Sequence, residues 1–114
     1  MDRNGYNDSL FDTEDGVCWL CGTMTGTVRH ELFKGRVNRS NSKAAGLWIA
    51  VCPHCHRLLH KHAYEEEMHR IGQVMFIHAG GTEADFVLTF GKNYIHDDAQ
   101  KEHADNFIRQ RRKR

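Results

Sequence analysis

The stretch Cys18-Trp19-Leu20-Cys21-Gly22, together with Cys52-Pro53-His54-Cys55-His56 further along, decides the fold of this chain. These two Cys-x-x-Cys knuckles contain all four cysteines of the sequence. Thiolates are preferred zinc ligands, and structural zinc takes four of them in a tetrahedron. The sequence therefore predicts one closed structural Zn2+ site, whose ligands are Cys18, Cys21, Cys52 and Cys55.

Two alternatives to this four-thiolate site remain open at the level of sequence. The cysteines could form two disulfides, or one histidine could replace a cysteine as the fourth ligand. No signal-peptide core and no apolar run of about 18 residues is present, so we expect a reducing cytoplasm rather than export or a membrane. In that compartment paired knuckles hold metal, which favours the zinc site.

Length and composition predict a single small globular domain. The chain has 114 residues, of which 39% are apolar and 27% charged, with a net charge of +1. A core of this size is supplemented in many small proteins by a structural metal, because metal binding adds directly to the free energy of folding.

The hydrophobic pattern predicts an α+β fold. Strands are expected at 27–33 and 47–51, a loop at 34–46, and helices from about 55, over 64–79 and from 82 to 90. We divide the chain into a flexible polar arm at 1–16, a zinc-stabilised domain at 17–95 and a polar basic tail at 96–114.

Three histidines are candidates for a second metal site. His56 and His60 lie four residues apart and project from one face of the expected helix, and His30 lies on the expected first strand. Three neutral imidazoles leave the remaining coordination positions open, as catalytic metal sites require. We expect a divalent cation there, Mg2+, Mn2+ or Zn2+. The other histidines are expected at the surface: His54, His62, His69, His78, His96 and His103.

This arrangement resembles the HNH (His-Me finger) endonucleases, and more closely the small HNH-type proteins of bacteriophages. The resemblance rests on the two knuckles, on His30-Glu31-Leu32-Phe33-Lys34-Gly35-Arg36-Val37-Asn38-Arg39-x-x-Ser42, on Gly46-Leu47-Trp48 and, more weakly, on Phe90-Gly91-Lys92-Asn93-Tyr94. It implies a ββα-metal core, which is a two-stranded hairpin crossed by a helix with a divalent cation between them. The helices that the hydrophobic pattern predicts from 64 onward are additional to this core. It also implies hydrolysis of DNA phosphodiesters, in the host cytoplasm if the chain is phage-encoded.

The first motif of that family is a metal ligand followed by the histidine that acts as general base. Here the motif has two possible registers. Either Arg29 takes the ligand position and His30 is the base, or His30 is the ligand and Glu31 takes the base position. The spacing to Asn38 and Arg39 favours the second. A carboxylate with a pKa near about 4.3 is a weaker base at neutral pH than an imidazole near about 6.5.

By the same resemblance Asn38 corresponds to the middle asparagine of the family, which orients the first motif, with Asn41 as the runner-up. Four cations in the same segment suit phosphate contact, and arginine can hold a phosphate with two hydrogen bonds. These candidate DNA-binding residues are Lys34, Arg36, Arg39 and Lys43. The basic residues at 109–114 would add salt-sensitive affinity for DNA.

The function predicted from these residues is a metal-dependent DNA endonuclease, with Glu31, His30 and Asn38 as catalytic residues. Two other classes remain open. The chain could be a zinc-stabilised nucleic-acid-binding module without hydrolytic activity. It could instead be a protein-interaction adaptor that docks through the helix carrying Met68, Ile71, Met75 and Phe76. The oligomeric state is not predicted.

Overall fold

A computed structural model describes residues 2 and 4–112 and confirms the α+β class. The described residues form a two-stranded antiparallel sheet and five helices. In chain order the elements are β1 (Val28–Glu31), α1 (Arg36–Ala45), β2 (Trp48–Val51), α2 (Pro53–Leu59), α3 (His62–His78), α4 (Glu83–Phe90) and α5 (Asp98–Arg112).

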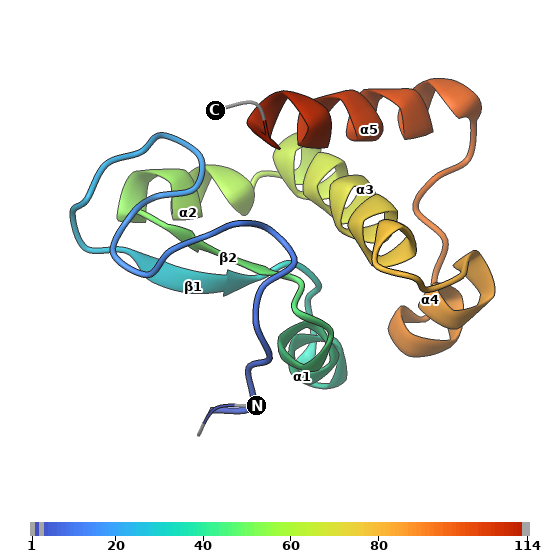
Figure 1. Ribbon diagram of the computed structural model, residues 1–114, viewed down its shortest axis with the longest axis horizontal. Coiled ribbons are helices and arrows are strands. Elements are labelled where there is room, and N and C mark those ends of the chain that lie inside the picture. The colour runs from blue at the N-terminus through green and yellow to red at the C-terminus, as the bar shows by residue number, and fades with distance from the viewer. Residues whose placement is uncertain (1, 3, 113–114) are drawn as a thin grey trace.

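The hairpin places the two knuckles and α2 together. Val28 pairs with Val51 and Glu31 with Trp48, so β1 starts where β2 ends. Every residue of β2 is buried, and the strand runs directly into Cys52 and then α2, as the sequence predicted. Figure 1 shows α2 beside the sheet and the N-terminal segment passing over the strands. The cysteine knuckles therefore join the hairpin to α2 at one end of the molecule.

The predicted loop at 34–46 is wrong, because residues 36–45 form helix α1. Its only buried residue is Ser42, and Val37 is 69% exposed, so the segment lacks the apolar stripe by which a helix is recognised. Polar contacts hold it instead, since the Asn38 and Asn41 side-chain amides donate to the carbonyls of Phe90 and Thr89 at the end of α4.

Glycine ends α1. Gly46 has φ of 73°, and its N–H bonds to the Lys43 carbonyl. A Cβ there would also collide with the backbone oxygen of Asp8. The left-handed conformation and the close approach both require glycine.

Helix α3 is the centre of the core. Met68, Ile71 and Met75 are buried on it, as the sequence predicted. Gly72 lets the helix approach the chain after β1, since a Cβ there would lie 3.0 Å from the Phe33 ring. At 17 residues α3 is the longest described helix. None of the described helices has the length and apolarity to cross a membrane.

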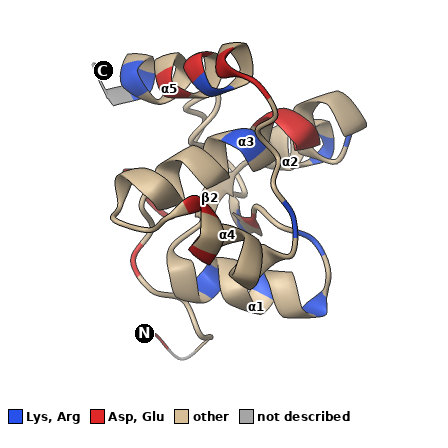
Figure 2. Cartoon of the chain, turned by 90° about the vertical axis from the view of Figure 1, so that its right-hand side faces the viewer, with Lys and Arg blue, Asp and Glu red and all other residues tan. Residues whose placement is uncertain are grey.

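The expected polar tail at 96–114 is, as far as it is described, the ordered helix α5 packed across α3 (Figure 1). Ala104 and Ile108, four residues apart, are buried, and Arg111 stacks on Trp19 with 4.1 Å between its guanidinium carbon and the ring centroid. Too few apolar residues mark this face for sequence reasoning to find it. Figure 2 shows basic residues at the C-terminal end of α5. Residues 113–114 lie outside the described residues.

Residues 1–16, expected to be a flexible polar arm, also differ from that expectation, because the described part of the segment packs on the sheet. Phe11 is 1% exposed, Leu10 N–H donates to the Gly46 carbonyl, and the Ser9 hydroxyl donates to the Trp48 carbonyl. The segment covers β2 on the side that β1 leaves free, and its polar residues make the hydrogen bonds that an edge strand needs. Residues 1 and 3 lie outside the description.

Candidate metal sites

The four cysteines come together as predicted. Each offers one sulfur, and the four sulfurs lie within 4.8 Å of one another. All four are free thiols, and Cys21 Sγ lies 3.7 Å from Cys52 Sγ, well beyond a disulfide bond length. The disulfide alternative is therefore not the arrangement found. The chemistry and spacing of this donor set fit a metal ion, and zinc suits it best.

Each knuckle directs backbone N–H groups at its own sulfur. Cys21 N–H donates to Cys18 Sγ and Cys55 N–H donates to Cys52 Sγ, both at 3.5 Å. Cys52 caps the N-terminus of α2, with Pro53 at the first helical position, where a missing N–H costs nothing. The Trp19 N–H donates to the Ala50 carbonyl, which ties the first knuckle to β2.

The electrostatics of the cluster favour thiolate at one position and oppose it at another. Burial pushes the pKa of Cys18 upward, but N–H groups of Cys52, Cys21 and Leu20 outweigh it and lower the pKa to about 6. Burial and the neighbouring thiols raise the pKa of Cys55. Four thiols this close cannot all lose their protons without a cation, and a divalent metal removes that conflict.

His30, His56 and His60 also come together, from β1 and from the end of α2. Each offers one ring nitrogen, and the three nitrogens lie within 4.8 Å of one another, which could hold a metal ion. The Nε2 atoms of His56 and His60 are 3.3 Å apart. His60 is the C-cap of α2 rather than a helical residue, yet it keeps helical backbone angles and stays one turn above His56. The predicted juxtaposition of the three rings is therefore found.

The protonation of His30 suits a ligand and not a general base. Burial, followed by the charges of His56 and His60, lowers the pKa of His30 to about 3. The pKa of His56 is also lowered, by burial first and then by His60. A ring with a pKa near 3 is neutral at pH 7 and accepts a proton weakly. The register in which His30 is the base is therefore disfavoured.

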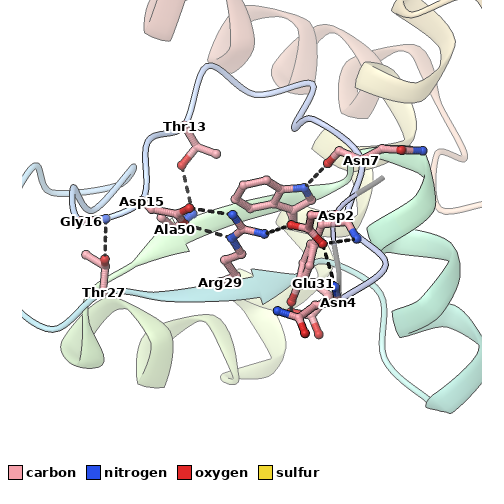
Figure 3. A network of polar contacts seen from close by, with 12 residues as sticks. Asp2, Asn4, Asn7, Thr13, Asp15, Gly16, Thr27, Arg29, Glu31 and Ala50 are labelled. Atoms are coloured by element: carbon pink, nitrogen blue, oxygen red, sulfur yellow. Dashed lines mark hydrogen bonds and ion pairs between the residues drawn. The ribbon is translucent and has the colours of Figure 1, made fainter.

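Arg29 is also unsuited to the position that this register gives it. Its guanidinium donates to Asp15 through Nε at 2.9 Å and Nη2 at 2.6 Å, and to Asp2 through Nη1 at 3.0 Å. Figure 3 shows these contacts between β1 and the N-terminal segment. Arg29 is committed to two carboxylates, and a guanidinium is not a metal ligand, so of these two residues only His30 could serve as a metal ligand.

Glu31 lies beside the histidines. A cavity of about 220 Å³ is lined by Glu31 and by the three histidines, together with Arg29, Lys34 and Arg39. Side chains alternate along β1, so His30 and Glu31 leave opposite faces. Both side chains nevertheless line this cavity, and β1 has a partner strand on one side only among the described residues. The Glu31 carboxylate already accepts a hydrogen bond from Tyr6, at 3.0 Å.

The four candidate DNA-binding cations fall into two pairs. Lys34 forms an ion pair with Glu65 at 2.6 Å, and Lys43 donates to the Asn4 carbonyl at 3.4 Å and lies over the Tyr6 ring. Arg36 and Arg39 are exposed on α1, and Arg39 lines the histidine cavity. Figure 2 shows α1 carrying basic residues and no acidic ones. Arg36 and Arg39 are thus the pair available to a ligand.

Asn38 and Ser42 connect α1 to two other parts of the fold. The Asn38 side-chain amide donates to the Phe90 carbonyl at the end of α4. Ser42 is fully buried, donates through its hydroxyl to the Asn38 carbonyl at 2.8 Å and accepts from the Phe33 N–H at 3.3 Å. It therefore ties α1 to the chain just after β1. Its position four residues after Asn38 on an unrecognised helix hid this role.

One histidine expected at the surface is in the core. His69 is 5% exposed and stacks on Phe33, with 5.0 Å between ring centroids and 15° between planes. Burial lowers the pKa of His69, against the pull of Glu65 and Glu66. The ring acts as a neutral aromatic side chain. The other five, at positions 54, 62, 78, 96 and 103, are exposed as predicted.

No family model, no curated protein and no solved structure matches this chain. What stands is a small α+β protein whose four cysteines are positioned to hold a metal ion.

Proposed function

We propose that the protein is a metal-dependent endonuclease of the HNH type, which hydrolyses phosphodiester bonds in DNA. The observation that carries the proposal is the convergence of His30 on β1 with His56 and His60 at the end of α2. These rings open onto a cavity that also contains a carboxylate and an arginine. A closed cysteine cluster beside them fixes β2 to α2, so the histidine pair is positioned on a rigid support.

Each residue at the cavity has a distinct part in the proposed reaction. His30, His56 and His60 would bind a divalent cation, which when bound supplies Lewis acidity for the scissile phosphate and the leaving oxygen. Glu31 would accept a proton from the attacking water, because His30 is too weak a base. Arg39, with Arg36 on the same helix, would hold the phosphate by hydrogen bonds. The cysteine-bound zinc would keep the scaffold in place.

A second candidate function is DNA binding without hydrolysis. The observation that favours it is at Glu31, a carboxylate that stands where the family has a histidine. The exposed arginines of α1 would serve such a module equally well. The adaptor hypothesis is weakened, because Met68, Ile71 and Met75 are buried in the core and offer no docking face.

The test is conversion of supercoiled plasmid to its nicked form in the presence of Mg2+, Mn2+ or Ni2+. His56→Ala removes one candidate ligand nitrogen, and His62→Ala removes an exposed histidine that does not line the cavity, as the matched control. Loss of a residue that only supports a ligand costs about 10–100-fold, so loss of the ligand itself should cost more than about 100-fold. The control should nick like the wild type.

The assay also separates the three functions. Metal-dependent nicking that His56→Ala loses supports the enzyme. Plasmid binding without nicking, in every metal tried, contradicts the enzyme and supports the binding module. A protein that neither binds nor nicks the plasmid would favour the adaptor. The tightly held zinc alone cannot decide, because all three functions retain it.

A further inference from the structure

The geometry points to a part for the N-terminal segment in the candidate active site. We propose that Tyr6 is a positioning residue, whose hydroxyl holds the Glu31 carboxylate in the orientation needed to accept a proton from water. The proposal rests on the proposed endonuclease function. It assigns a role to a residue that lies outside the zinc knuckles and outside every motif of the sequence.

A single hydrogen bond joins the two residues. Tyr6 Oη donates to Glu31 Oε2 at 3.0 Å, across 25 positions of sequence. Burial, followed by the charge of Glu31, raises the pKa of Tyr6 to about 12, so the phenol keeps its proton at any pH used for DNA cleavage. Among the described residues no donor meets the other oxygen, Oε1. One oxygen is therefore fixed and the other remains open to water.

Tyr6 is itself held from three sides. Its ring packs edge-on against Trp48, with centroids 5.4 Å apart, and the Arg29 guanidinium lies 4.6 Å from its centroid. The indole Nε1 of Trp48 donates to the Asn7 carbonyl at 2.9 Å, which holds the segment at the next residue (Figure 3). The hydroxyl is therefore presented by a packed aromatic side chain and not by a free loop.

The same segment also removes a competitor for Glu31. Arg29 lies two residues before Glu31 and projects from the same face of β1, where it could pair with that carboxylate. Asp15 and Asp2 occupy its guanidinium instead, and Figure 3 shows all three with Glu31 close by. A carboxylate paired with arginine would be a poorer proton acceptor. The segment thus supplies Glu31 with a neutral donor and diverts the cationic one.

Positioning of this kind affects the chemical step and not the binding of metal or DNA. A general base must lie within hydrogen-bond reach of the water it deprotonates, and a free glutamate spends most of its time in other rotamers. Tyr6→Phe keeps the ring and removes only the hydroxyl. We expect kcat for plasmid nicking to fall about tenfold, with KM and Mn2+ affinity unchanged.

Two comparisons distinguish positioning through Glu31 from a general structural effect. Tyr64→Phe, on an exposed tyrosine of α3, is the matched control and should leave kcat unchanged. Glu31→Asp keeps a carboxylate but shortens the side chain by one methylene, which breaks the contact with Tyr6. In that background Tyr6→Phe should have no further effect on kcat. A change in overall stability would lower kcat equally in both backgrounds.

The outcomes are separable. A tenfold fall in kcat that disappears in the Glu31→Asp background supports the proposal. An unchanged kcat in Tyr6→Phe, or an equal fall in both backgrounds, overturns it and leaves the endonuclease function standing. A wild-type protein that binds plasmid but does not nick it with any of the metals overturns both proposals, because Glu31 then has no water to activate.

Discussion

The cysteine cluster and the histidine cluster are built on neighbouring parts of one scaffold, yet they differ in ligand type, in burial and in access to solvent. Three of the four cysteines are buried, and backbone N–H groups donate to the sulfurs of Cys18 and Cys52. Two of the three histidines are half-buried and the third is exposed, and all three line a cavity with charged walls. A closed set of thiolates holds a metal for stability, whereas an open set of imidazoles leaves positions for a substrate. The contrast separates the scaffold from the proposed chemistry.

The largest expected effect comes from breaking the scaffold. Cys55→Ser removes a buried thiolate, and structural zinc in small domains contributes about 10–16 kcal/mol of binding free energy that is also folding free energy. We expect the variant to lose cooperative thermal unfolding in circular dichroism. His54→Ala, at the exposed neighbouring position, should melt like the wild type. A folded Cys55→Ser protein with one bound zinc would contradict the structural role of the cluster.

A smaller effect is expected at Ser42, between the scaffold and the first motif. Ser42→Ala leaves the Phe33 N–H buried without an acceptor, which should cost about 1–3 kcal/mol. Denaturant unfolding measures this cost directly. Ser40→Ala, on the exposed face of the same helix, is the control and should change stability by less than about 0.5 kcal/mol. Equal effects in the two variants would contradict the bridging role of Ser42.

The smallest effect is expected on DNA affinity, when a cation that lines the histidine cavity is removed. Arg39→Ala should reduce the slope of log K against log salt by about 1, because one phosphate contact is lost. Lys34→Ala should change the slope less, since Lys34 already pairs with Glu65 at 2.6 Å. Fluorescence anisotropy at several salt concentrations measures both slopes. A larger change in Lys34→Ala would mean that the ion pair opens when DNA binds.

The parts of the fold that follow from sequence are those with strong local signals. The knuckle spacing predicted the four-thiol cluster, and the i, i+4 spacing of His56 and His60 predicted their meeting with His30. The Thr82 hydroxyl caps α4 by accepting from the Asp85 N–H, as their spacing indicated. In each case a short spacing within the chain gives the signal, and for the cysteines and histidines their shared ligand chemistry indicates which distant residues meet.

The parts that sequence reasoning missed depend on contacts between distant segments. Helix α1 is held by amide contacts to α4, and α5 docks through the buried residues Ala104 and Ile108. Tyr6 reaches Glu31 across 25 residues, and no local pattern marks such a pair. His69 looked like a surface histidine because nothing near it in the sequence reveals that Phe33 and Tyr94 enclose it.

We propose that the histidines hold a cation separate from the one held by the cysteines. A Mn2+ titration of the zinc-loaded protein tests this proposal, with the free ion measured by electron paramagnetic resonance. We expect one bound Mn2+ per wild-type chain and none in His56→Ala, while both proteins keep one zinc. Equal Mn2+ binding in the two proteins, or none in either, would contradict the claim.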